Sequence, residues 1–253
     1  MADQVKRKYG WYRSSPDIRD IKYGLTRGVL RSSDLRSGMP PVYNQGQTSS
    51  CTGNSIAAAF EYELIKQGLF DWTPSRLFIY WNERVIEHTS SDPDAGATIR
   101  DSVCSILYKG VPSEKLWPFD ETKVTTKPSA EVFTAAAKNT IDHYAAVPQN
   151  LTNIVSVLDY GHPILFGTTL YTEFEGNQVA SNGIVSMPSA NDSTVGGHAM
   201  LIVGADMDNK RFIVRNSWGA DWGDKGYCYF PFDYMLHPDL SSDFWVITGV
   251  KVR

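Results

Sequence analysis

A cysteine at the start of a predicted helix is the residue best suited to chemistry in this chain. Cys51 ends the run NQGQTSSC at residues 44–51, and an apolar stretch beginning at Ile56 follows it. A helix N-terminus carries unpaired N–H groups and a partial positive charge, which favour a nucleophilic thiolate. Gln45 is a side-chain donor that could bind a developing oxyanion. Taken alone, the segment fits a nucleophile and a small buried cysteine equally well.

A thiol nucleophile needs a base, and His198 and Asn216 could supply it. A strand-like run follows His198, and Asn216 stands at the end of the next such run, with an Asp-Asn turn between them. A hairpin of this kind brings the two side chains together. The Asn216 carbonyl would then accept from one ring nitrogen and aim the other at Cys51, while Trp218 shields the bond from water.

The elements that would position these residues divide into a helical half and a sheet half. Helices are predicted from Cys51 to Gly68, from Ser75 through Val85, from Thr98 to Gly110, and more weakly over 129–139 and 150–160. Short strands are predicted at 163–167, 199–203, 211–215, 227–230 and 244–247. Helices followed by strands predict an α+β fold with two lobes rather than alternating βαβ units.

Composition excludes several classes of function. The 253 residues carry a net charge of −4 with no Lys/Arg-rich run, which argues against a nucleic-acid partner. No apolar run could span a bilayer, and the polar N-terminus lacks the apolar core of a signal peptide, so we expect no membrane partner. Three distant cysteines predict no disulfide framework and a cytoplasmic or otherwise reducing compartment. No His/Cys cluster has zinc spacing, so no metal is expected.

Three segments in register resemble the papain/cathepsin family of cysteine peptidases. They are NQG through Cys51, Gly-His-Ala at 197–199, and NSWGADWG at 216–223. His198 follows Cys51 by 147 residues (198 − 51), inside the family's window of roughly 130–150. Because only about 27 residues precede the region similar to the mature enzymes, the chain looks like a short-propeptide microbial (bacterial or viral) member.

The resemblance implies a role for each matching residue. Cys51 is then the nucleophile and His198 its ion-pair partner and proton donor to the leaving amine. Asn216 orients the imidazole, and Gln45 with the Cys51 N–H forms the oxyanion hole. A further set is implied to bind substrate: the backbone of Gly96, the pocket walls Ala97, Thr98, Gly167 and Ala199, and Trp218.

The chain also departs from the family pattern. Thr48 replaces a cysteine that usually forms a disulfide, and Thr52 replaces a tryptophan that usually follows the nucleophile. We expect Cys104 and Cys228 to be buried structural thiols. The other histidines, His88, His143, His162 and His237, are expected at the surface or at caps.

The resulting expectation is a papain-like peptidase domain over residues 28–253. A mainly helical lobe (about 40–130) and a β-sheet or open-barrel lobe (about 140–253) would flank the cleft. We expect a monomeric endopeptidase that acts on peptides or proteins without a cofactor, and residues 1–27 that pack on the body as a propeptide-like, autoinhibitory extension. Acyl transfer to another amine, or peptide binding without catalysis, remains open at this stage.

Overall fold

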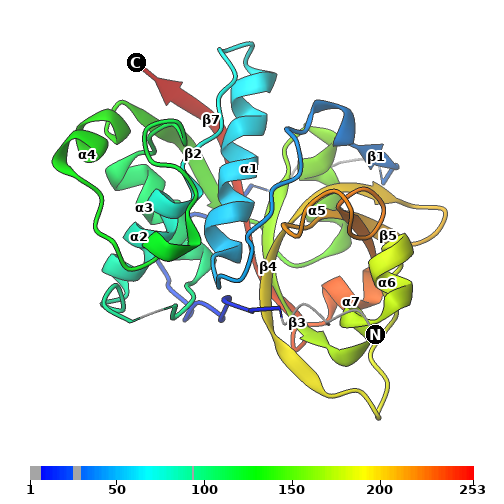
Figure 1. The fold of residues 1–253 in the computed structure, drawn as a ribbon. Helices are drawn as coiled ribbons and strands as arrows, with labels where there is room; N and C mark the ends of the chain where they lie inside the picture. Colours follow the sequence, from blue (N-terminus) through cyan, green and yellow to red (C-terminus); the bar gives the residue numbers. More distant parts are fainter. Residues whose placement is uncertain (1–6, 25–29, 93) are drawn as a thin grey trace.

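The computed structural model describes residues 7–24, 30–92 and 94–253 of the chain. The helices of residues 76–136 lie on one side of the molecule, and most of the sheet lies on the other side together with the later helices; the first long helix stands between them (Figure 1). The α-helices are α1 (Cys51–Lys66), α2 (Arg76–Ile86), α3 (Ile99–Lys109), α4 (Ala130–Ala136), α5 (Leu151–Asp159), α6 (Asn177–Asn182) and α7 (Phe232–Leu236). Short 3₁₀ turns occupy Arg36–Gly38, Glu121–Lys123 and Thr172–Glu175.

Capping residues explain where the helices of the first half begin and end. The side chain of Ser75 accepts a bond from the N–H of Phe78 at the start of α2, and Thr98 accepts one from Asp101 at the start of α3. Gly68 (φ +67°) and Gly110 (φ +73°) follow α1 and α3 in conformations that side chains disfavour. These predicted boundaries are therefore confirmed.

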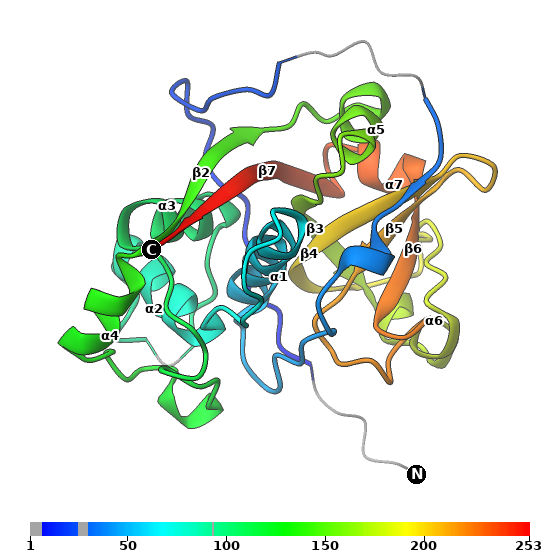
Figure 2. The same cartoon turned by 90° about the horizontal axis from the view of Figure 1, so that it is seen from above.

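The strands of the described residues form one antiparallel sheet in the order β2-β7-β3-β4-β5-β6, with β1 paired to β4. The sheet curls without closing, so the expected α+β architecture is confirmed (Figure 2). The strands are β1 (Ser33–Asp34), β2 (Asn139–Ala146), β3 (Ile164–Tyr171), β4 (Thr194–Asp206), β5 (Arg211–Arg215), β6 (Tyr227–Pro231) and β7 (Ser241–Val252).

One predicted helix is shorter than expected, and a strand takes its place. The helix predicted over 129–139 ends at Ala136, and β2 begins at Asn139 and pairs with β7. Only Ile141 and Ala145 are fully buried in this edge strand, so its sequence carries a weak alternation. The helix is thus confirmed with an earlier end, and the strand was missed because its pairing partner, β7, lies about a hundred residues away in the chain (252 − 139 = 113).

Helix α1 holds the two halves together. Its small residues Ala57, Ala58 and Ala59 are buried and let the helix backbone lie close to the sheet, beside β4 and β7. Seen along its axis, α1 stands between α2 and α3 on one side and β3 and β4 on the other (Figure 2). These alanines belong to an apolar core between α1 and the sheet, and a second apolar core fills the curl of the sheet. The N-terminal end of α1 therefore meets the middle of β4.

Residues 7–14, which we call the strap, cross beneath the N-terminal end of α1 (Figure 1). The N–H of Trp11 donates to the carbonyl of Gly197 in β4 (2.9 Å), and the N–H of Ala97 donates to the carbonyl of Gly10 (2.7 Å). The strap is thus hydrogen-bonded to both halves of the molecule. The chain then continues past β2, where Tyr23 bonds Ala146. The ends of the predicted extension, residues 1–6 and 25–27, lie outside the described residues.

Among the described residues, no helix is long and apolar enough to cross a membrane. All three cysteines fall within the described ranges and are free thiols. Cys228 is buried as expected, but Cys104 on α3 is only half-buried, because it lies at the edge of the face that packs inward. His162 is also half-buried, and its Nδ1 lies 2.7 Å from the Glu63 carboxylate.

Candidate active site

Cys51 is the first residue of α1 and its side chain is fully buried. Three backbone N–H groups approach its sulfur, from Ala199 in β4, from Gly10 in the strap and from Thr52 in the first turn of α1. The helix N-terminus, the sheet and the strap therefore converge on one thiol.

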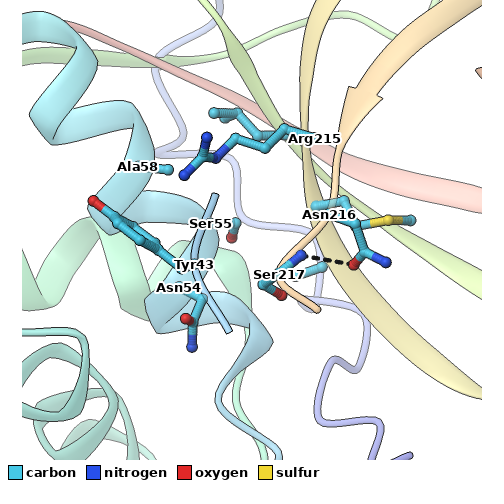
Figure 3. Close-up of a pocket in the computed structure, with 10 residues that line it drawn as sticks. Tyr43, Asn54, Ser55, Ala58, Arg215, Asn216 and Ser217 are labelled. Atoms are coloured by element: carbon cyan, nitrogen blue, oxygen red, sulfur yellow. Dashed lines mark hydrogen bonds between the residues drawn. The ribbon is translucent and has the colours of Figure 1, made fainter. Parts of the chain in front are cut away.

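The hairpin of β4 and β5 brings His198 and Asn216 together. His198 Nε2 lies 2.8 Å from Asn216 Oδ1, and the backbone N–H of Ser217 donates to the same oxygen (2.8 Å; Figure 3). Because an N–H group donates to it, this atom is the amide oxygen, and Nε2 must carry the ring proton. His198 Nδ1 is then the basic nitrogen. It is buried and has no hydrogen-bond partner among the described residues, which leaves it free to take a proton.

Two aromatic rings enclose this imidazole. The ring of Trp218 lies 5.1 Å from that of His198 at 32°, and Tyr9 of the strap meets the imidazole edge-on at 5.9 Å. Trp218 is itself 4% exposed. Water is thereby kept from the bond between His198 and Asn216, as expected from the sequence.

The amide of Gln45 is fixed by Ser217, the residue after Asn216. Its Oε1 accepts a bond from the Ser217 hydroxyl (2.6 Å), which turns Nε2 the other way. Nε2 donates to the carbonyl of Thr48 (2.8 Å) and lies 3.5 Å from the carbonyl of Lys8 in the strap. A donor suited to an oxyanion thus faces a carbonyl of the strap.

Burial keeps both reactive groups neutral in this structure. Desolvation raises the pKa of the Cys51 thiol from 9.0 to about 11, despite the backbone N–H groups beside it. Desolvation likewise lowers the pKa of His198 from 6.5 to about 4, with the hydrogen bond to Asn216 opposing the shift. The sequence predicts a thiolate at this helix N-terminus. Under the strap, the loss of water outweighs the helix dipole.

The residues implied to bind substrate contact the strap in most cases. A Cβ on Gly96 would lie 2.2 Å from the carbonyl oxygen of Gly10, but the backbone bond to that oxygen comes from Ala97. Gly167 lies against the indole of Trp11. Thr98 differs from the others, because its hydroxyl caps α3.

Ala199 and Trp218 complete this set. Ala199 is fully buried beside Cys51, in the same apolar cluster as Trp11. Trp218 contacts Tyr9 and lies under the guanidinium of Arg7, 4.6 Å from its ring centroid.

Three further polar residues beside the site were not found from the sequence. Ser217 orients Gln45, and its place next to Asn216 was the available signal. Glu83 on α2 is fully buried and accepts a bond from Thr52, the residue after Cys51 (2.7 Å). Asp243 on β7 accepts bonds from the strap. Nothing in the local sequence marks Glu83 or Asp243, because only the tertiary fold brings them here.

The rear of the site is closed. Behind Asn216 and Ser217, the junction of α1 with β4 and β5 encloses a cavity of about 10 Å³, room for no more than one water molecule (Figure 3). Arg215 spans this junction by donating to the carbonyls of Pro40 and Pro41. A substrate would therefore reach Cys51 from the side that the strap occupies.

No cluster of three or more His, Cys, Asp or Glu side chains suited to a metal ion occurs in the described parts of the chain. The chemistry that the site offers is that of a thiol, an imidazole with one free nitrogen, and amide donors.

Comparison with known proteins shows which family the chain belongs to. The model of the papain family cysteine proteases matches residues 30–235. An uncharacterised peptidase C1-like protein of Acanthamoeba polyphaga mimivirus is 34% identical over 275 aligned positions, which cover 97% of this chain and 88% of that protein. Procathepsin L of Mus musculus is 24% identical, and the match covers 85% of this chain and 64% of that protein.

Among solved structures, xylellain, a cysteine protease from Xylella fastidiosa, superposes with a TM-score of 0.91 at 35% identity, covering 100% of this chain and 99% of that one. A viral relative and a bacterial neighbour agree with the microbial character expected from the sequence. The match of the family model over most of its length shows that the chain belongs to the papain family of cysteine proteases, which are hydrolases.

Proposed function

We propose that the chain is an endopeptidase that cleaves peptide bonds through an acyl-enzyme on Cys51. The single observation that carries this proposal is the arrangement around β4: the N–H of Ala199 approaches the Cys51 sulfur, the preceding residue His198 has an unpartnered Nδ1, and Ser217, next to the His198 partner Asn216, fixes the amide of Gln45. These are the nucleophile, base and oxyanion donor that acyl transfer needs.

In the proposed reaction, His198 Nδ1 takes the thiol proton and the Cys51 sulfur attacks the substrate carbonyl carbon. The oxyanion accepts bonds from Gln45 Nε2 and the Cys51 N–H. The C–N bond breaks as His198 returns the proton to the leaving amine. Water then attacks the thioester, His198 takes its proton, and the acid leaves as the thiol is restored. Because the nucleophile must be a free thiol, we also propose that the enzyme works in reducing surroundings.

We further propose that the N-terminal segment inhibits the enzyme. Three features support this: the strap occupies the approach to Cys51, its Tyr9 covers His198, and a carbonyl of Lys8 faces Gln45. The strap offers Cys51 the N–H of Gly10, and the Gly10 carbonyl oxygen accepts a bond from the N–H of Ala97 rather than from the oxyanion donor Gln45. It is therefore held as an inhibitor and not as a substrate.

Incubation of the full chain carrying Trp11→Ala, which weakens the hold of the strap, with peptides, followed by mass spectrometry of the products, tests the activity. We expect fragments that have gained one water, from internal bonds, and no cleavage by Cys51→Ala. An added amine separates hydrolysis from acyl transfer, because a transferase would join the amine to the acyl fragment. Peptides that bind to the Trp11→Ala chain without being cleaved would contradict catalysis.

A further inference from the structure

Two segments from different parts of the chain meet beside the thiol, and no covalent bond joins them. The first, residues 45–50, carries Gln45 and leads into Cys51; we call it the oxyanion loop. The second, residues 94–97, lies between α2 and α3; we call it the edge segment. All three cysteines are free thiols, so no disulfide links the two segments. Noncovalent contacts must therefore set their separation.

The edge segment hydrogen-bonds an extended chain that lies beside Cys51. In this structure that chain is the strap: the N–H of Ala97 donates to the carbonyl of Gly10 (2.7 Å), and Trp11 forms a parallel bridge with Ala97. A substrate chain in the same place would meet the same backbone groups. Its carbonyl carbon reaches the Cys51 sulfur only if the edge segment is fixed relative to the oxyanion loop.

The carboxylate of Asp94 joins the two segments. Its two oxygens accept bonds from the backbone N–H of Ser49 (2.9 and 3.0 Å), and Oδ2 also accepts one from the Ser49 hydroxyl (3.1 Å). Ser49 stands in the oxyanion loop, two residues before Cys51. The Asp94 side chain is 11% exposed, so water competes little for these bonds.

The hydroxyl of Tyr80 on α2 extends this connection along the edge segment. It donates to Asp94 Oδ1 (2.9 Å) and accepts a bond from the backbone N–H of Gly96 (2.9 Å). Burial raises the pKa of the Tyr80 phenol, and the Asp94 charge raises it further, so the hydroxyl keeps the proton that it donates. Gly53 leaves room for this tyrosine against α1, because a Cβ there would lie 3.3 Å from the Tyr80 Cβ.

We infer that Asp94 is a positioning residue of the proposed peptidase, which holds the edge segment in register with the thiol and the oxyanion donors. The inference rests on the proposed function. Asp94 acts through Ser49 and Tyr80 and not on the reacting atoms. In this structure the carboxylate also accepts a bond from Lys8 of the strap (2.9 Å), but the Ser49 and Tyr80 donors remain when the strap leaves.

The test compares two p-nitrophenyl esters on the full chain carrying Trp11→Ala, which is the parent here. One ester has an acyl part of four amino acids, long enough to pair with the edge segment. The other is the butyrate ester, whose acyl part has no backbone amide. We expect the ratio of kcat/KM, peptidyl over butyrate, to fall at least about tenfold when Asp94→Ala is added, because a misplacement of about 1 Å can cost about a hundredfold. This ratio does not depend on the fraction of molecules whose strap is open.

Two matched variants separate positioning from stability. Asp94→Asn keeps an oxygen for the Ser49 N–H and the Tyr80 hydroxyl, and its NH₂ group can donate to the Ser49 hydroxyl, so the ratio should stay within about threefold of the parent. Asp92→Ala removes an exposed carboxylate of the same loop and should leave the ratio unchanged. If Asp94 served only stability, Asp94→Ala would lower the melting temperature and leave the ratio as it is.

Tyr80→Phe covers the case in which Asp94→Ala does not fold. It removes only the hydroxyl between Asp94 and Gly96, and the ratio should fall about fivefold, the range of one hydrogen bond. An unchanged ratio in the folded variant overturns the inference, and so does a parent that turns over the peptidyl ester no faster than the butyrate. In both cases the esters are still hydrolysed at Cys51, so the inference falls alone. If neither ester acylates Cys51, the proposed function falls with it.

Discussion

Replacing Trp11 by alanine should uncover the thiol of Cys51. A buried tryptophan removes about 150–250 Å² from water, worth on the order of 4–6 kcal/mol at about 25 cal/mol per Å². Truncation to alanine in a packed site costs about 3–5 kcal/mol. The backbone bonds of the strap to Gly197 and Ala97 remain. At about 1.4 kcal/mol per factor of ten, the fraction of molecules whose strap is detached from the cleft should rise by a hundredfold or more, until the strap is detached in nearly all of them.

The rate at which an alkylating reagent modifies Cys51 measures this opening directly. Modification is located by peptide mapping, with Cys104 as an internal reference thiol. Trp72→Ala is the matched control, since Trp72 packs on Phe60 away from the strap (ring centroids 5.7 Å). We expect a large acceleration at Cys51 in Trp11→Ala only. A folded Trp11→Ala protein whose Cys51 reacts within twofold of the wild-type rate would show that the strap does not cover the thiol.

Three other predictions concern buried polar groups. Burial lowers the pKa of His198 to about 4 from 6.5. Between pH 4 and 6.5, His198 is therefore protonated in the unfolded chain but not in the folded chain. Stability should therefore fall as the pH drops through this window, and urea unfolding of His198→Gln should show a smaller fall. Burial raises the pKa of Glu83 to about 8 from 4.5, so the folded chain keeps a proton and stability should decline as the pH rises from 4.5 to 8. Glu83→Gln should remove that decline, which amounts to up to about 5 kcal/mol of unfolding free energy at pH 9. A variant whose stability falls with pH as steeply as that of the wild type would refute the assignment of the decline to Glu83. In the Trp11→Ala background, Gln45→Ala should lower kcat by about 10²–10³ while alkylation of Cys51 stays within a few-fold, because the oxyanion donor acts only once substrate reacts.

The pairing of His198 with Asn216 could be predicted because it depends on local rules. A hairpin turn sets the register of β4 against β5, and Leu201 pairs with Arg215 one residue before Asn216. The extent of α1 is equally local, since an apolar run follows Cys51 and Gly68 follows the end of the helix. Such features depend on residues close in the chain, which periodicity and turn chemistry report.

The features that the sequence could not give depend on distant partners. β2 forms because it pairs with β7, and its apolar alternation is too weak to predict a strand. Asp243 lies 232 residues from Trp11 (243 − 11), and their bond exists only when the strap crosses the cleft. The neutral state of Cys51 has the same origin, because burial by a remote segment raises its pKa above the value that the helix end would favour.

Mass spectrometry of the enzyme during turnover tests the central claim most directly. The Trp11→Ala chain is mixed with a slowly hydrolysed peptide ester, quenched in acid, and digested for mapping. The account predicts a mass increase equal to the acyl group on the peptide that contains Cys51, and no such increase when His198→Ala is added. An acyl group on Cys104, or ester cleavage that continues unchanged in Cys51→Ala, would contradict it.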